Sequence, residues 1–180
     1  GQPKGVMISH SAAAEQCQVV QARWGLDAGT RVLQFTPLSF DASVEQVFAT
    51  LSAGAVLVLA DPASLAPKVF SVMLMIQQIN ILNIPPAFAL ELLREWQHRP
   101  ELIPPALQTL ITGGDVLAVE AVQLWQDRLR DRVPLLNAYG PTETTITACL
   151  HSVMPITGPI TQIPLGRPAG NRQIYRPSPD

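Results

Sequence analysis

The sequence predicts an α/β fold with a mainly parallel sheet flanked by helices, and three observations support this prediction. Short apolar runs of strand length alternate along the chain with segments of helical composition or spacing. One run, AVLVLA at 55–60, is uninterrupted, which is typical of a strand covered on both faces. Polar or glycine-rich segments follow three of the predicted strands, at the edge of a parallel sheet where ligands gather.

The first elements are predicted from their composition and end residues. We expect a helix over 10–25, because Ser9 is a suitable N-cap, Ala, Gln and Glu favour helix, and Gly25 can end it. The segment 31–40 indicates a strand that runs into a loop. A short helix over 41–54 follows, with a glycine at its C-terminal end, and it precedes the apolar strand.

The remaining elements continue the alternation. Helical composition or spacing recurs in three segments, at 71–80, 87–99 and 116–131. Apolar runs predict three further strands, at 81–86, 107–115 and 134–140. Two prolines stop the first of these strands, and a glycine turn ends the second.

The composition argues against several classes of function. The 180 residues can bury a core, but only 14% of them are charged, against about 25% in an average protein. A net charge of −2 predicts neither a nucleic-acid nor an anionic-membrane partner, and no apolar run could span a bilayer. Cys17 and Cys149 show neither metal-site nor disulfide spacing, and no signal peptide is visible, which favours a cytoplasmic location.

Prolines change the pattern after about residue 150. We expect residues 1–150 to form a central α/β part and residues 151–180 to lead, through loops or edge strands, into another subdomain. The chain opens without Met and closes without a helix or strand, so we expect it to be a piece of a larger protein.

Two glycine-containing segments are candidate ligand contacts. In GQPKG, Lys4 stands between two glycines just before a helix, which is the chemistry of a phosphate-binding loop. In TGGD, Gly113 and Gly114 would let a flat ligand lie against the backbone. The alternatives are a solvated loop lysine and an ordinary turn.

The segment NAYGPTETT, which begins in the last predicted strand, carries more specific chemistry. Asn137 offers a donor and an acceptor to a purine edge, and Tyr139 offers a face for stacking. Thr142 can donate to a phosphate oxygen, and Glu143 can hold the magnesium ion of a nucleotide. The alternative is a decorated turn with a core tyrosine and an exposed glutamate.

In this order, PKG, SFDAS, the glycine turn and NAYGPTE resemble the adenylate-forming (AMP-binding) superfamily. More narrowly, they resemble the large N-terminal subdomain of the adenylation domain of a nonribosomal peptide synthetase, over nearly the whole chain. The resemblance implies ATP- and Mg²⁺-dependent activation of a carboxylic acid as an adenylate. The acyl group then passes to the phosphopantetheine thiol of a carrier domain, expected in the same polypeptide.

The resemblance also assigns roles at the nucleotide. The residues implied to contact it are Gly113, Gly114, Asn137, Tyr139 and Thr142. Catalytic roles are implied for Lys4 on the β- and γ-phosphates, Thr142 on the α-phosphate and Glu143 on magnesium. The first half of the phosphate loop, the hinge and the small subdomain with its adenylation lysine are not in this sequence. We therefore expect this piece alone to be inactive.

By the same resemblance, Asp41 of the FDAS stretch pairs with the α-ammonium group of an amino acid. A helix-capping role for Asp41 is an alternative that could coexist with this pairing. The amino-acid pocket implied by the family is lined by Asp41, Ala42, Glu45, Asn83, Ile111, Gly113, Ala138, Ile146 and Thr147.

Glu45 suggests which amino acid is activated. It follows Asp41 by four residues, so a helix puts both carboxylates on one face. With Asn83 opposite, and with the small Gly113 and Ala138 leaving depth, we expect a basic side chain of the ornithine or lysine type. Alternatively, Glu45 hydrogen-bonds a neutral polar side chain or points to water.

Two other functions remain open at this point. The first is a non-catalytic, adenylation-like binding or scaffold module. The second is a ligase outside an assembly line, acting as a stand-alone amino-acid or acyl-CoA-type enzyme.

Overall fold

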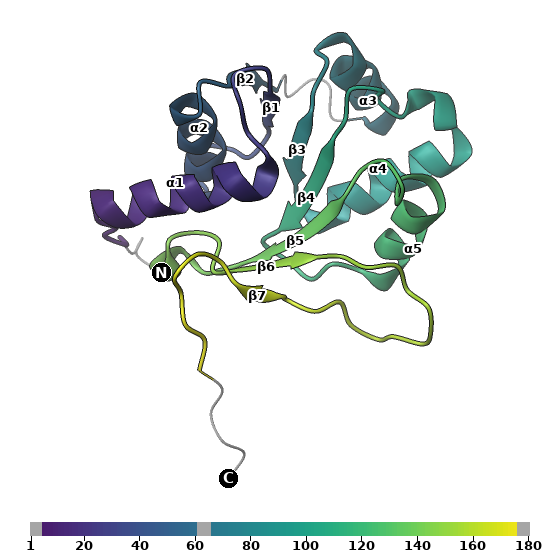
Figure 1. Cartoon of the computed structure of the whole chain (residues 1–180). Helices are drawn as coiled ribbons and strands as arrows, with labels where there is room; N and C mark the ends of the chain where they lie inside the picture. The colour runs from purple at the N-terminus through teal and green to yellow at the C-terminus, as the bar shows by residue number, and fades with distance from the viewer. Residues whose placement is uncertain (1–4, 61–65, 176–180) are drawn as a thin grey trace.

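The computed structural model describes residues 5–60 and 66–175, which form a single sheet with helices on both faces (Figure 1). The strands are β1 (Arg31–Gln34), β2 (Val56–Leu59), β3 (Ile81–Ile84), β4 (Thr109–Gly113), β5 (Leu135–Tyr139), β6 (Cys149–Ser152) and β7 (Arg167–Pro168). The helices are α1 (His10–Trp24), α2 (Ala42–Ser52), α3 (Pro67–Ile76), α4 (Pro86–His98) and α5 (Val119–Arg128), with short 3₁₀ turns η2 (Pro100–Leu102) and η3 (Thr142–Thr144).

The sheet has seven described strands in the order β2-β1-β3-β4-β5-β6-β7. Neighbouring strands from β2 to β5 are parallel, whereas β6 is antiparallel to β5 and β7 is antiparallel to β6. The predicted α/β fold with a mainly parallel sheet is therefore confirmed.

Helix α1 shows the local signals that the sequence predicts. The Ser9 side chain accepts a hydrogen bond from the backbone N–H of Ala12, and Gly25 ends the helix with a φ of 71°. This left-handed conformation suits glycine because glycine has no Cβ to clash. Both predicted ends of the helix are confirmed.

The predicted strand at 55–60 is present, but the prediction that both of its faces are covered is wrong. β2 is the edge of the sheet next to β1, and Val56 and Leu59 are exposed. An unbroken apolar run therefore does not mean that both faces are covered here. In this chain the doubly covered strand is β3, whose four residues are all buried.

Helix α3 begins earlier than predicted, at Pro67, and ends at Ile76. Proline suits the first turn of a helix, because its missing N–H would have no partner there. Gln78 then adopts a φ of 51°, which turns the chain into β3 before the predicted helix end at residue 80.

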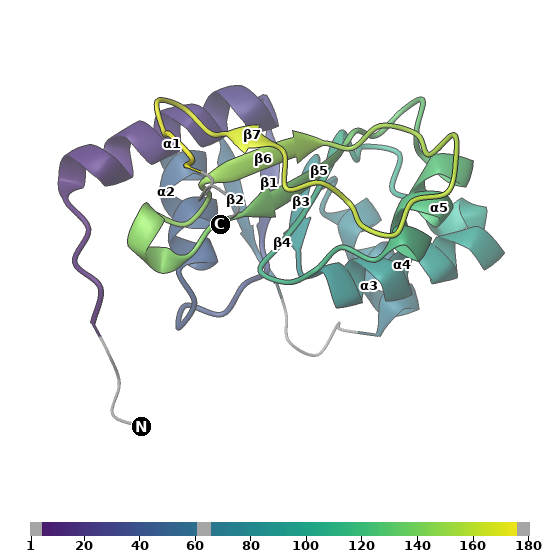
Figure 2. The same cartoon turned by 90° about the horizontal axis from the view of Figure 1, so that it is seen from below.

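The proline-rich part of the chain continues the same sheet. β6 begins before residue 150, and β7 pairs with it at the edge. Between them the chain passes α5, where the backbone N–H of Ile156 donates to Gln126 Oε1 at 2.7 Å (Figure 2). The predicted edge strand is present, and the division of the chain at residue 150 stays a prediction.

The two faces of the sheet carry separate apolar clusters. α3, α4 and α5 cover one face, where Leu82 and Ile84 of β3 point, and α1 and α2 cover the other, where Ile81 points (Figure 1). Among the described residues, none of the helices combines the length and apolar character that a bilayer crossing requires.

Candidate functional site

Strand alternation places four of the predicted pocket residues on the face covered by α1 and α2. Asn83 pairs with Ile111, and Gly113 pairs with Ala138, near the carboxyl ends of β3, β4 and β5. Ile111 belongs to the apolar cluster under α1 and α2, and Ala138 packs against it. Because side chains of a strand alternate between faces, all four positions share this face of the sheet.

Gly113 is a glycine for a steric reason. A Cβ added there would lie 2.8 Å from the backbone oxygen of Ala138, closer than real contacts allow. Gly114, the next residue, has a φ of 87° and open space around it. The predicted glycine turn is present, and it exposes backbone at the end of β4, as contact with a flat ligand would require.

The end of β5 separates the two predicted sets of contacts. Asn137 and Tyr139 alternate with Ala138, so the residues assigned to adenine and the residue assigned to the amino-acid pocket point to opposite faces. Asn137 is buried, and its Nδ2 donates to the backbone oxygen of Pro164 at 3.0 Å. The oxygen Oδ1 is the atom that an adenine amino group would need. Tyr139 is 48% exposed, so about half of its surface is open to a ligand such as a stacked base.

The turn after β5 is tightly folded. A Cβ on Gly140 would overlap the backbone oxygen of Ile146 and would lie 2.5 Å from the backbone nitrogen of Ala148. Thr145 and Ile146 both have positive φ, at 63° and 67°. This compact turn directs Thr142 back toward the start of α2.

Asp41 and Thr142 meet although 101 residues separate them. Thr142 Oγ1 donates to Asp41 Oδ2 at 2.5 Å. Asp41 stands at the N-cap position of α2, but its side chain makes no capping hydrogen bond. The structure therefore joins the predicted ammonium partner to the predicted α-phosphate contact.

Glu45 is buried in a polar network on the same side. Its Oε1 accepts from Gln16 Nε2 at 2.5 Å, and its Oε2 accepts from Thr147 Oγ1 at 3.2 Å. The pKa of Glu45 is raised to about 7, mainly because the carboxyl group is buried, and the negative charge of Asp41 adds to this rise. The two hydrogen bonds and the positive charge of Arg172 lower the pKa in part.

A cavity of about 790 Å³ lies beside these residues, between α1, α2 and the turn after β5. Its polar lining includes Gln16, Asp41, Glu45 and Thr142, and its apolar lining includes Ala13, Ala14, Val44, Phe48 and Ile146. Of the predicted pocket residues, Asp41, Glu45 and Ile146 line this cavity. Ala42 follows Asp41 on α2, Thr147 reaches Glu45, and the four sheet residues lie on the sheet face below α1 and α2 without lining the cavity.

Two further residues, Lys4 and Glu143, are predicted to be catalytic. Lys4 lies outside the described residues. Glu143 is exposed on η3, and the described residues contain no group of three His, Cys, Asp or Glu side chains that could hold a metal. One exposed carboxylate fits Mg²⁺ when substrate phosphates and water supply the other ligands, as is usual for this ion.

Sequence reasoning missed two residues, Gln16 and Arg172. Gln16 shares the buried stripe of α1 with Val20 and Trp24, at a spacing of four residues. A polar residue on an apolar stripe is a signal that could have found it. Arg172 follows the last strand in a loop and bonds Gln16 at 2.6 Å, and no sequence pattern predicts this contact.

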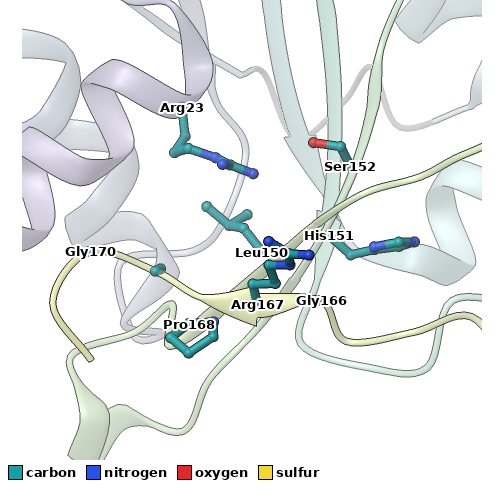
Figure 3. Close-up of a pocket in the computed structure, with 9 residues that line it drawn as sticks. Arg23, Leu150, His151, Ser152, Gly166, Arg167, Pro168 and Gly170 are labelled. Carbon is teal, nitrogen blue, oxygen red and sulfur yellow. The ribbon is translucent and has the colours of Figure 1, made fainter. Parts of the chain in front are cut away.

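A second, smaller cavity of about 310 Å³ lies beside β6 and β7 (Figure 3). Arg23 of α1, His151 of β6 and Arg167 of β7 contribute to its lining. None of the predicted site residues that the structure describes lines it, so it is separate from the group around Asp41 and Glu45.

Comparison with known proteins shows which family the chain belongs to. The family model described as AMP-binding enzyme matches residues 1–175. An isonitrile lipopeptide synthase from Streptomyces coeruleorubidus is 36% identical over 170 residues, which are 93% of this chain and 12% of that protein. The chain spans between 2% and 15% of the length of eight curated relatives that it matches.

Solved structures agree with the fold. A nonribosomal peptide synthetase, FmoA3, solved with α-methyl-L-serine-AMP bound, superposes with a TM-score of 0.86 at 27% identity, over 95% of this chain and 19% of that one. The Vibrio cholerae adenylation domain AlmE, solved with glycyl-adenosine-5'-phosphate, gives a TM-score of 0.80 at 27% identity, over 93% of this chain and 31% of that one.

Proposed function

Because the chain belongs to the AMP-binding enzyme family and is homologous to the adenylation domains of nonribosomal peptide synthetases, we propose that its protein activates an α-amino acid. In this reaction a carboxylate oxygen of the amino acid attacks the α-phosphorus of ATP, and pyrophosphate leaves with the electrons of the broken P–O bond. The phosphopantetheine thiol of a carrier domain then loses its proton and attacks the acyl carbon of the adenylate, which forms a thioester and releases AMP.

The contact between Asp41 and Thr142 carries this proposal. One side chain would bind the α-ammonium group, and the other would bind the α-phosphate, and they lie 2.5 Å apart. In an α-amino acid the ammonium and carboxylate groups share one carbon, so an ammonium held at Asp41 puts the carboxylate near a phosphate held at Thr142. Alignment of this kind can supply a large part of the rate enhancement.

Other residues of the chain would hold the nucleotide. Tyr139, which is partly exposed, would stack on adenine, and Asn137 would accept from the adenine amino group. Glu143 would hold Mg²⁺, which supplies positive charge to the phosphate oxygens. The backbone at Gly113 and Gly114 allows a flat base to approach without meeting a side chain.

For the substrate we propose a basic amino acid of the ornithine or lysine type. Glu45 provides a carboxylate at the wall of the cavity, one helical turn from Asp41. A cation that reached this carboxylate would favour its ionised form, which burial otherwise disfavours. The competing interpretation is a neutral polar substrate, because Gln16 and Thr147 already donate to Glu45.

ATP–pyrophosphate exchange on a complete adenylation domain that contains this chain tests the proposal. We expect exchange with ornithine or lysine, and exchange with valine or phenylalanine alone would overturn the basic substrate. Asp41→Asn should lower amino-acid-dependent exchange by at least about tenfold, because a charged partner of the ammonium is lost. Asp127→Asn, at an exposed position on α5, is the matched control.

Nucleotide titration separates an enzyme from a non-catalytic module. We expect isothermal titration of the same domain with ATP and Mg²⁺ to give a saturable heat. Absence of any nucleotide binding would favour the scaffold function.

A further inference from the structure

We propose that Gln16 is a specificity-positioning residue, which fixes the carboxylate of Glu45 in the cavity and links it to Arg172. This inference rests on the proposed activation of a basic amino acid. Gln16 comes from α1 and is not one of the nine positions that the family resemblance assigns to the pocket.

Both the nitrogen and the oxygen of the Gln16 side-chain amide form hydrogen bonds. It is 2% exposed, its Nε2 donates to Glu45 Oε1 at 2.5 Å, and its Oε1 accepts from Arg172 Nη2 at 2.6 Å. Thr147 holds the other oxygen of Glu45 at 3.2 Å. Both carboxylate oxygens therefore have a protein donor, so the carboxylate has one defined orientation.

Arg172 is itself held in place by backbone carbonyls. Its Nη1 donates to the oxygen of Ala169 at 2.9 Å, and its Nε donates to the oxygen of Thr144 at 3.2 Å. The guanidinium thus ties the chain after β7 to the turn that carries the nucleotide residues. The orientation of Gln16 follows from this anchor, because a guanidinium can only donate and must meet the amide oxygen.

The charges around Glu45 explain why an amide suits this position. The charged or titratable groups that face its carboxylate are Asp41 on the same helix, Cys17 on α1 and Arg172 beyond β7. The amide of Gln16 donates a hydrogen bond to Glu45 without adding a charge, and its oxygen accepts a hydrogen bond from the guanidinium of Arg172. Within the described part of the chain both side chains that donate to Glu45 are neutral, so no protein cation is bonded to its carboxylate in place of a cationic substrate.

This arrangement predicts an effect on selectivity. Without the Gln16 donor, the ionised form of Glu45 loses a hydrogen bond in a buried site, and its neutral form becomes more favourable. A neutral carboxyl group attracts an ammonium less than a carboxylate does. The preference for ornithine over norvaline, which has the same carbon chain without the terminal amine, should therefore fall.

The experiment compares Gln16→Met with Gln21→Met in the complete adenylation domain. Gln21 also lies on α1 and lines the same cavity, but its side-chain hydrogen bonds go to Ala49 O and Ser52 Oγ on α2 and not to Glu45. We expect Gln16→Met to lower the ratio of kcat/KM for ornithine to that for norvaline by about tenfold. The pH at which ornithine selectivity appears should also move upward, and Gln21→Met should leave both quantities unchanged.

Gln16→Glu provides a second variant that keeps the length and shape of the side chain. It retains an oxygen for Arg172 but loses the donor and adds a like charge beside Glu45, so the same upward shift in pH is expected. If wild type prefers ornithine but both variants keep its ratio and pH midpoint, the inference about Gln16 is wrong. If wild type shows no preference for ornithine over norvaline, the basic substrate is wrong and this inference fails with it.

Discussion

The two faces of the sheet differ in what they bury. Among the described residues, a cluster of twenty buried apolar residues lies under α3, α4 and α5, whereas the cluster under α1 and α2 has nine. The second face instead buries hydrogen-bonded polar side chains, among them Gln16, Glu45 and Thr147. Buried polar groups cost free energy unless they are paired, so the smaller apolar cluster of the second face is accompanied by hydrogen bonds between buried side chains.

Exposed apolar side chains occur on helices of both faces, for example Ile76 on α3 and Phe48 on α2. On α2, Val44 and Phe48 are exposed apolar side chains, and both line the 790 Å³ cavity next to Asp41 and Glu45. The face under α3, α4 and α5 serves as a support for β3, β4 and β5. The ends of these strands, together with α2, then hold the predicted binding residues in place.

The largest expected effect is on the face under α3, α4 and α5, at Trp96. This side chain is fully buried, and its Nε1 donates to Ser71 Oγ at 2.9 Å. Trp96→Ala should cost about 3–5 kcal/mol of unfolding free energy, because it leaves a large cavity. Thermal denaturation of the complete domain measures this cost. Trp96→Phe, which keeps most of the packing, should cost clearly less, and equal losses would contradict a packing role.

On the other face, Glu45 makes stability depend on pH. Its pKa is raised from an ordinary value of 4.5 to about 7, so the folded protein binds a proton more tightly than the unfolded chain does. The stability linked to this proton is fully present below pH 4.5 and is lost as the pH rises to about 7. A shift of this size corresponds to about 3 kcal/mol at most.

Denaturation from about pH 4 to about pH 8 measures this contribution as a difference between wild type and the Glu45→Gln variant. The amide of the variant does not titrate, so the stability difference should change in favour of the variant as the pH rises through this window. A difference that stays constant over the same pH range would show that Glu45 does not titrate there.

Gly140→Ala tests how tightly the site is folded. The new Cβ would overlap the backbone of Ile146 and Ala148, which cannot move as a side-chain end can. We expect a loss of about 1–3 kcal/mol of stability and a loss of amino-acid-dependent exchange, because the turn carries Thr142. Gly158→Ala, where nothing lies within 4 Å of the new Cβ, should change neither.

The sequence predicted the fold because its signals are local. Ser9, Gly25 and the prolines after β3 act on the backbone within a few residues of themselves, so the ends of these elements could be predicted. The cover of β2 could not be predicted, since it depends on strand order, and an apolar run looks the same at an edge as in the centre. The position of β2 beside β1 alone leaves Leu59 exposed.

The sequence could propose residues for the site, but it could not propose the contacts between them. Asp41, Glu45 and Thr142 could be proposed from motifs, but the bond between Asp41 and Thr142 spans 101 residues of sequence. The bond from Arg172 to Gln16 spans 156 residues, and no local pattern describes it. The polar network of the second face therefore depends on contacts between distant parts of the chain, which only the folded structure reveals.

The smallest expected effect lies back on the face that contains Trp96, at the ion pair between Arg94 of α4 and Glu120 of α5. Their atoms approach to 2.8 Å, but both side chains are about half exposed, so water screens the attraction. Glu120→Gln should therefore change the unfolding free energy by less than about 1 kcal/mol, close to Glu91→Gln at an exposed position on α4. A loss as large as that of Trp96→Ala would mean that charges, and not apolar packing, hold α4 and α5 on this face.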